Sequence, residues 1–156
     1  MKPNIKKLLL CLAIPLAVGG LSALLSGGMD SYDSLRQPPL SPPGWVFPVV
    51  WSILYLLMGY SCYRVLTSGA TQTAVYNGLS LYAIQLVLNF LWTPVFFGLQ
   101  WRLVALLILI GLWVAVLLTI RTFSDMDQKA GDLLLPYLIW ITFAGYLNFA
   151  VYLLNK

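Results

Sequence analysis

The sequence contains no histidine and few charged residues. Without imidazole the chain lacks the commonest general base, metal ligand and haem axial ligand, so we expect no metal site and no required cofactor. Charged residues make up 9% of the 156 residues, whereas soluble domains carry about 25%. Such a composition cannot solvate the surface of a globular protein of this size.

Cysteine is also scarce, and both cysteines lie in apolar stretches. Lipid or packed helices would surround Cys11 and Cys62, so we predict two free thiols rather than a disulfide framework. The net charge of +4 is spread over the ends of the apolar stretches and forms no dense basic run, which argues against a nucleic-acid partner.

Long apolar stretches are what the sequence has in abundance. Hydrophobic residues make up 60% of the chain, and a spanning helix takes roughly 20 residues. This predicts an all-α integral membrane protein, a bundle of five transmembrane helices in a single membrane domain over residues 1–156. The first stretch is interpreted as a span rather than a cleaved signal peptide, because four more follow it. The predicted spans are 5–26, 45–66, 76–99, 103–123 and 133–154.

The predicted connections are short, apart from the first, residues 27–44. Its prolines fix φ and make a stiff loop. A second polar loop is expected over 124–132. Lysine and arginine beside the connections number six on the N-terminal side and three on the other, namely Lys2, Lys6, Lys7, Arg64, Arg121 and Lys129 against Arg36, Arg102 and Lys156. This ratio favours a cytoplasmic N-terminus, with the proline-rich loop outside.

Every Asp, Lys and Arg lies in a loop or at the end of a predicted span. A charge at mid-bilayer costs at least about 2.5 kcal/mol, and such residues usually mark ion and proton pathways. Their absence argues against a proton-coupled pump and against a channel lined by rings of charge. A carrier or binder of an apolar ligand remains open.

Amide and aromatic side chains share one face of the third span. Gln85, Asn89, Trp92 and Phe96 are spaced by four, three and four residues, which brings them onto one side of a helix. Two interpretations of the amides remain open. They bind neighbouring helices, which is worth about 0.6 to 2 kcal/mol for each bond, or they orient a ligand.

Aromatic residues recur at helical spacing in two other spans. Trp51, Tyr55 and Gly59 follow one another at intervals of four, which stacks two rings above a position where backbones can approach. Ordinary core packing explains this stripe equally well. In the last span Trp140 and Ala144 share a face, and a large ring beside a small residue makes a wall with a recess.

The remaining spans carry other signals. Gly19 and Ala23 have the spacing of close helix packing, which predicts that the first span packs through small residues. The fourth span, 103–123, is almost entirely aliphatic, so we expect it to face lipid or a second copy of the chain. Aromatic residues at span ends are typical of a belt at the lipid headgroups, and they are Trp45, Trp101 and Tyr137.

Three long motifs occur along the chain in a fixed order. They are PLSPPGWVFPVVW at 39–51, QLVLNFLWTPVFFG at 85–98, and LPYLIW at 135–140 followed by Leu147 and Asn148. With them the whole chain resembles the translocator protein family, also called the tryptophan-rich sensory protein or peripheral-type benzodiazepine receptor family. The resemblance implies a five-helix bundle, often a homodimer, with a pocket beneath the first loop that binds porphyrins and isoquinoline carboxamides.

The resemblance also implies which residues bind the ligand. Residues 27–44 would cap the pocket. A flat tetrapyrrole, such as protoporphyrin IX, wants stacking faces worth about 0.5 to 1.5 kcal/mol each and a few polar groups for orientation. By motif position the ligand-binding residues would be Tyr32, Trp51, Tyr55, Asn89, Phe90, Trp92, Trp140, Ala144 and Leu147.

For bacterial relatives the resemblance further implies light- and oxygen-dependent breakdown of protoporphyrin, with Trp51 and Trp140 as the catalytic residues. An indole beside an excited porphyrin can be oxidised without histidine, metal or nucleophile, although the same indoles would serve equally as stacking walls. Two other classes remain open, a passive transporter of tetrapyrroles or sterols and a ligand-sensing regulatory scaffold. The short loops favour a bacterial protein in the cytoplasmic membrane.

Eukaryotic members of the family are linked to cholesterol through the end of the last helix. A loose form of that pattern is present as Leu147, Tyr152 and Lys156, although such patterns are weak signals. Phe149 stands where the family pattern has tyrosine, and Leu153 stands where the eukaryotic pattern has arginine. Sterol is therefore not an expected partner of this chain.

Overall fold

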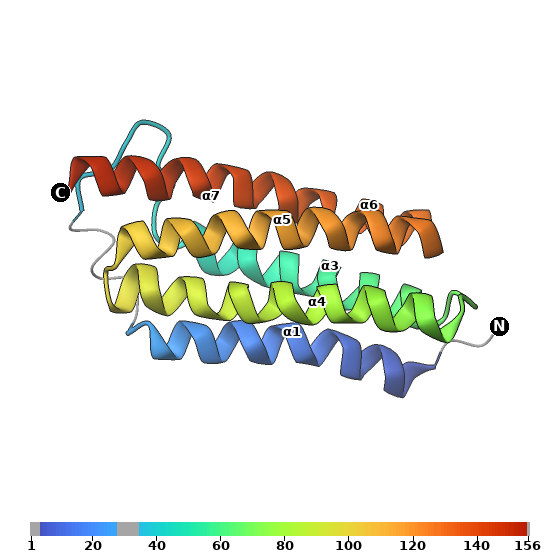
Figure 1. The fold of residues 1–156 in the computed structure, drawn as a ribbon. Coiled ribbons are helices and arrows are strands. Elements are labelled where there is room, and N and C mark those ends of the chain that lie inside the picture. The colour runs from blue at the N-terminus through green and yellow to red at the C-terminus, as the bar shows by residue number, and fades with distance from the viewer. Residues whose placement is uncertain (1–3, 28–34, 156) are drawn as a thin grey trace.

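The computed structural model describes residues 4–27 and 35–155, and all regular elements within them are helices. Five of these helical segments are long and apolar enough to cross a membrane. They run along one common direction, with the two ends of the chain at opposite ends of the bundle (Figure 1). The segments are α1 (Ile5–Leu25), α3 (Val46–Leu66), α4 (Gln72–Thr93) with η1 (Pro94–Gly98), α5 (Arg102–Met126), and α6 (Gln128–Leu133) with α7 (Leu135–Leu154). The predicted five-helix membrane bundle is confirmed.

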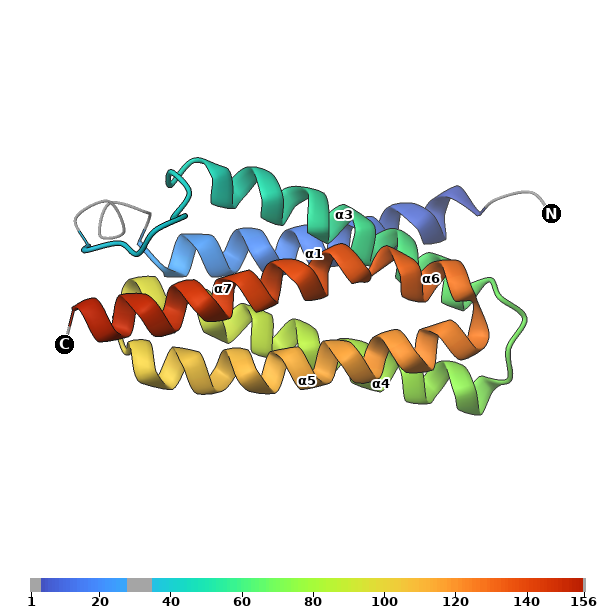
Figure 2. The same cartoon turned by 90° about the horizontal axis from the view of Figure 1, so that it is seen from above.

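The helices form a ring around a common core (Figure 2). In order around the ring, α1 packs against α3, α3 against α6, α6 and α7 against α5, α5 against α4, and α4 against α1. Each helix therefore has one face toward its neighbours and one face toward the surroundings of the bundle. The side chains that meet in the middle come from all five spanning segments.

The prediction that the fourth span faces outward is wrong for one of its two faces, which is buried in the bundle. Leu109, Leu112 and Val116 of α5 are buried, and α5 packs against both α4 and α7. Only its other face, which includes Leu107 and Ile110, is exposed. Aliphatic side chains suit lipid and protein interiors equally well, so an aliphatic helix does not reveal in its sequence which face is turned inward.

Helix α1 is instead the most exposed of the spanning segments. Its buried residues are Cys11, Pro15, Gly19 and Ser22, which form a single narrow stripe. The Ser22 hydroxyl donates a hydrogen bond of 2.8 Å to the carbonyl of Phe90 in α4. The prediction that this helix packs through small residues is confirmed at Gly19 and Ser22, whereas Ala23, which is expected in the same packing stripe, is exposed.

A glycine on α3 sets the closest approach between α1 and α3. A Cβ atom built on Gly59 would lie 2.5 Å from the Cys11 carbonyl oxygen and 2.7 Å from the Leu12 Cα atom. Only glycine therefore allows the two backbones to touch here. Cys11 and the nearby Cys62 are buried free thiols, as predicted.

Two helix boundaries differ from the prediction. Helix α4 begins earlier, at Gln72, because the Thr71 side chain caps it by accepting a hydrogen bond from the Ala74 amide at 3.2 Å. The polar loop expected over 124–132 is mostly helical. Its polar residues belong to the end of α5 and to α6, whose first amides are capped by Asp127 through the Lys129 amide at 3.1 Å.

Candidate functional site

Trp51 occupies the centre of an aromatic cluster between α3, α4 and α7. Its ring stacks on Tyr55 with centroids 5.6 Å apart, and it lies 6.4 Å from Trp92 and 6.0 Å from Tyr137. Trp92 in turn stacks on Phe96 at 5.2 Å. One half-buried indole thus joins three helices through ring contacts.

The cluster continues along α3 to a second tryptophan. The Phe47 ring meets Phe97 edge to face at 6.3 Å and Trp140 at 5.8 Å, and Trp140 contacts Phe143 at 5.6 Å. The Trp140 Nε1 atom is buried without an acceptor among the described residues. A buried donor without a partner costs about 1 to 3 kcal/mol, so this indole N–H is a candidate contact for a ligand acceptor.

A chain of hydrogen bonds runs through the cluster and links α3, α4 and α7. The Tyr55 hydroxyl donates to Asn89 Oδ1 at 3.0 Å, and Asn89 Nδ2 donates to the Tyr137 oxygen at 2.7 Å. The Tyr137 hydroxyl donates to Gln85 Oε1 at 2.7 Å. The two amides of α4 therefore bind neighbouring helices, which is the first of the two interpretations that the sequence left open.

The position of Tyr137 differs from the prediction. It was expected in the aromatic belt, yet only 1% of it is exposed, whereas Trp45 and Trp101 are 69% and 58% exposed at helix ends as expected. The reason is α6, which lengthens the last membrane-spanning segment so that it begins at Gln128. Tyr137 consequently lies deeper in the bundle than the predicted span start at residue 133 implied.

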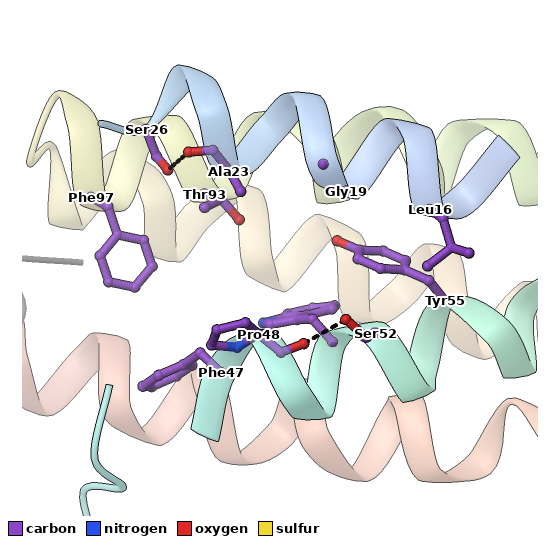
Figure 3. Close-up of a pocket in the computed structure, with 12 residues that line it drawn as sticks. Leu16, Gly19, Ala23, Ser26, Phe47, Pro48, Ser52, Tyr55, Thr93 and Phe97 are labelled. Atoms are coloured by element: carbon purple, nitrogen blue, oxygen red, sulfur yellow. Dashed lines mark hydrogen bonds between the residues drawn. The ribbon is translucent and has the colours of Figure 1, made fainter. Parts of the chain in front are cut away.

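A cavity of about 250 Å³ lies beside the cluster, between α1 and α3. In Figure 3 the α1 residues lie along one side of the gap and the α3 residues along the other, with Thr93 near Ala23 and Phe97 at the left end of the gap. Among the described residues, no charged side chain lines the cavity. The lining residues are Leu16, Gly19, Gly20, Ala23 and Ser26 of α1, Phe47, Pro48, Trp51, Ser52 and Tyr55 of α3, and Thr93 and Phe97 near the junction of α4 and η1.

The structure divides the predicted ligand-binding residues into groups. Trp51 and Tyr55 line the cavity. The cluster behind these two contains Asn89, Trp92 and Trp140.

Three of the other predicted residues, Phe90, Ala144 and Leu147, are not among the residues that line the cavity. Ala144 and Leu147 are buried in α7, and Phe90 accepts the Ser22 hydrogen bond. Tyr32 lies outside the described residues. Sequence reasoning missed the α1 wall, because glycine and alanine carry no ring or polar group to mark them, although the adjacent Gly19 and Gly20 were visible as a pair.

The described part of the first loop is fastened to α7. The Arg36 amide donates to Asn155 Oδ1 at 3.1 Å, and Asn155 Nδ2 donates to the Arg36 carbonyl at 3.0 Å. Further along the loop, the Tyr146 hydroxyl donates to the Pro39 carbonyl at 2.8 Å. These bonds hold residues 35–44 against the C-terminal half of the last helix.

Comparison with known proteins places the chain in a family. Residues 11–154 match the model of the TspO/MBR family. The chain is 40% identical to the tryptophan-rich protein TspO of Chlorobaculum tepidum over 99% of both chains. It is 43% identical to protein CrtK of Rhodobacter capsulatus, over 88% of this chain and 85% of the relative, and 40% identical to the translocator protein of Bos taurus, over 83% and 77%. The chain, a membrane bundle with this aromatic cluster, therefore belongs to the TspO/MBR family.

Proposed function

We propose that this protein binds a flat tetrapyrrole such as protoporphyrin IX between α1 and α3 and promotes its light-dependent breakdown. The observation that carries the proposal is the uncharged cavity whose wall is the stacked pair Trp51 and Tyr55. Flat aromatic ligands gain most from such faces. An uncharged lining also suits a ligand that reaches the protein through the bilayer.

The size of the cavity indicates how binding proceeds. Its volume of about 250 Å³ lies just below the roughly 300–1,000 Å³ of typical small-molecule sites, so a tetrapyrrole needs more room. Helix α1 supplies it, because α1 buries few residues and its backbone meets the backbone of α3 at Gly59, beyond the cavity. We infer that α1 swings outward about this contact, which widens the cavity at Gly19 and Ala23.

Polar groups for orientation are also at hand. The Trp140 Nε1 atom has no acceptor among the described residues and belongs to the ring cluster that contains Phe47, a cavity residue. A carboxylate or carbonyl oxygen of a bound ligand would supply the missing acceptor. We therefore assign Trp140 the role of a donor that fixes the ligand, in addition to its role in the chemistry.

The chemistry that we propose uses only the ligand, light, dioxygen and indole. Light raises the bound porphyrin to an excited state that takes an electron from the indole of Trp51 or Trp140. The reduced porphyrin passes that electron to dioxygen, which becomes superoxide, and the indole radical cation regains an electron from the porphyrin. The porphyrin radical cation then combines with superoxide and forms two C–O bonds across one C–C bond of the ring system. Cleavage of that C–C bond and of the O–O bond opens the ring as two carbonyl groups, so both atoms of dioxygen end in the product. Trp51 suits this role because it lies in the cavity wall and contacts Tyr55 and Tyr137, two further oxidisable rings.

The test compares binding in the dark with breakdown in the light. Purified protein is titrated with protoporphyrin IX in detergent, followed by porphyrin fluorescence, and is then illuminated with and without oxygen. The variants are Trp51→Phe and Trp140→Phe, with Trp113→Phe as the control, because Trp113 lies on α5 and bonds Thr142 outside the cluster. Retained dark binding with lost breakdown in Trp51→Phe supports the photochemistry. Weaker dark binding together with lost breakdown in Trp140→Phe supports its role as the donor that fixes the ligand.

Two outcomes would overturn parts of this proposal. If wild-type protein leaves protoporphyrin unchanged in light and oxygen, the catalytic claim fails and binding stands alone. If no dark binding occurs, the whole proposal fails. An isoquinoline carboxamide, the second ligand class that the family resemblance suggests, is expected to compete for the same cavity.

Passive transport of a tetrapyrrole is the second candidate function. It is favoured by the position of the cavity, since Gly20 and Ala23 in its lining are exposed on the outside of the bundle. A ligand bound there can exchange directly with the surrounding lipid. Vesicles with and without the protein, loaded with porphyrin on one side, test this through the rate at which the porphyrin reaches the other leaflet.

A further inference from the structure

A second hollow lies where α5 begins, at the end of the bundle opposite the loop that joins α3 to α4. It is a groove of about 360 Å³ where α5 begins beside the end of α7, and the two helix ends lie at the same end of the bundle (Figures 1 and 2). Trp101, Arg102 and Leu103 form one side, and Tyr152 and Asn155 form the other. The groove shares no residue with the cavity described above.

Arg102 is the charged residue of this groove, and it has no anionic partner among the described residues. Its Nε atom is buried and lacks an acceptor. Its backbone is held in place, since its carbonyl accepts a hydrogen bond of 2.8 Å from Asn148 Nδ2. The side-chain carboxylates of the described residues lie toward the opposite end of the bundle. They are Asp125 in the last turn of α5, Asp127 between α5 and α6, and Asp132 in α6.

Other features of the groove favour a negatively charged ligand. The first turn of α5 contains no acidic residue, so the positive end of the helix dipole adds to the charge of Arg102. Arg36 lies at the same end, because its backbone is bonded to Asn155 in the groove wall. No described carboxylate is there to receive an ammonium group.

The surface beside the groove is apolar and faces outward. Leu103 and Val104 are exposed, and the exposed face of α5 continues through Leu107 and Ile110 toward the middle of the span. Trp101 is exposed at the helix end, where tryptophan contacts lipid headgroups. A ligand that fits both the groove and the apolar face of α5 has an anionic head at Arg102 and an apolar tail along α5.

We propose that this groove binds an anionic phospholipid of the phosphatidylglycerol type. The planar guanidinium of Arg102 donates to two phosphate oxygens, a geometry for which arginine is better suited than lysine. One acyl chain lies along the exposed face of α5. A zwitterionic lipid offers the same phosphate but brings an ammonium group that finds no described carboxylate.

Native mass spectrometry of the delipidated protein in detergent tests the proposal. Wild type, Arg102→Gln, Arg102→Lys and Arg121→Gln are each titrated with phosphatidylglycerol and with phosphatidylcholine. Arg121→Gln is the matched control, because it removes one exposed cation from the other end of the same helix. We expect Arg102→Gln to lower phosphatidylglycerol occupancy by roughly tenfold or more, as loss of a charge-assisted contact implies, with Arg102→Lys intermediate and Arg121→Gln unchanged.

Three results would overturn the proposal. Equal losses in Arg102→Gln and Arg121→Gln would mean that lipid binding depends on net charge alone. Equal occupancy by the two lipids in wild type would remove the preference for an anionic head. Displacement of the lipid by inorganic phosphate at equal concentration would mean a site for a soluble anion. Should Arg102→Gln fail to fold, Arg102→Lys keeps the charge and decides the question by its intermediate occupancy.

Discussion

The ring of Tyr55 lies directly against the backbone of Gly19, so that α3 and α1 touch at the edge of the cavity. A Cβ atom built on Gly19 would overlap the Cε2 atom of that ring. The same tyrosine hydroxyl is tied to Asn89 at 3.0 Å. Tyr55 therefore cannot move away from α1 without straining or breaking its hydrogen bond to α4.

Gly19→Ala is expected to destabilise the protein by about 1 to 3 kcal/mol, the usual cost of overpacking, and to weaken porphyrin binding. The added methyl group pushes the Tyr55 ring into the cavity and strains its hydrogen bond to Asn89. Gly20→Ala is the matched control, because nothing lies within 4 Å of a Cβ atom at that position. Thermal unfolding in detergent and a porphyrin titration measure the two effects. Equal behaviour of the two variants would contradict the close contact.

Asn89→Leu is expected to destabilise the bundle by about 1 to 3 kcal/mol. The change removes the bonds to Tyr55 and Tyr137 and leaves the buried Tyr55 hydroxyl without its acceptor, whereas the Tyr137 hydroxyl keeps its bond to Gln85. Interhelical bonds in membranes are worth about 0.6 to 2 kcal/mol each. Unfolding by titration with sodium dodecyl sulfate measures the loss. The control is Asn77→Leu, at an exposed position of the same helix. An Asn89→Leu variant as stable as wild type would show that the network does not hold the helices together.

The sequence predicts the five spans and the inward face of α4, because apolar length and a spacing of three and four residues are local properties. The inward face of α5 could not be predicted, since Leu107 and Leu109 differ in burial but not in chemistry. The depth of Tyr137 in the bundle could not be predicted either, because it depends on whether residues 128–133 extend the last spanning segment. The α1 wall of the cavity could not be predicted either, because it depends on the missing side chain of Gly19, which lets the Tyr55 ring pack against the α1 backbone.

The ion pair between Arg64 and Asp127 ties α3 to the start of α6. Arg64 Nε lies 2.7 Å from Asp127 Oδ2, and a second nitrogen lies 3.3 Å from Oδ1. Asp127 also caps α6, so Asp127→Ala loses the ion pair and the cap. Arg64→Gln loses the ion pair and the long, exposed contacts of the guanidinium with Tyr60. The pair is partly exposed and worth about 0 to 1 kcal/mol, and the cap about 1 kcal/mol more.

Detergent unfolding of Arg64→Gln, Asp127→Ala and the double variant measures these contributions. We expect Asp127→Ala to be the more destabilising single change by about 1 kcal/mol. The double variant should cost less than the sum of the two, by the energy of the ion pair. Strictly additive losses would show that the ion pair contributes nothing and that Asp127 acts through the cap alone.

The buried free thiols of Cys11 on α1 and Cys62 on α3 lie near each other, close to the point where Gly59 lets the two backbones touch. An oxidant such as copper phenanthroline with dioxygen should therefore join them within one chain, with loss of two hydrogen atoms in the intact mass. The Cys62→Ser variant should show no such loss. If α1 swings about this contact when a ligand enters, the cross-linked protein still binds protoporphyrin, because the contact lies beyond the cavity. Loss of binding on cross-linking would mean that α1 has to separate from α3 along its whole length. That result would contradict the inferred swing of α1 about Gly59.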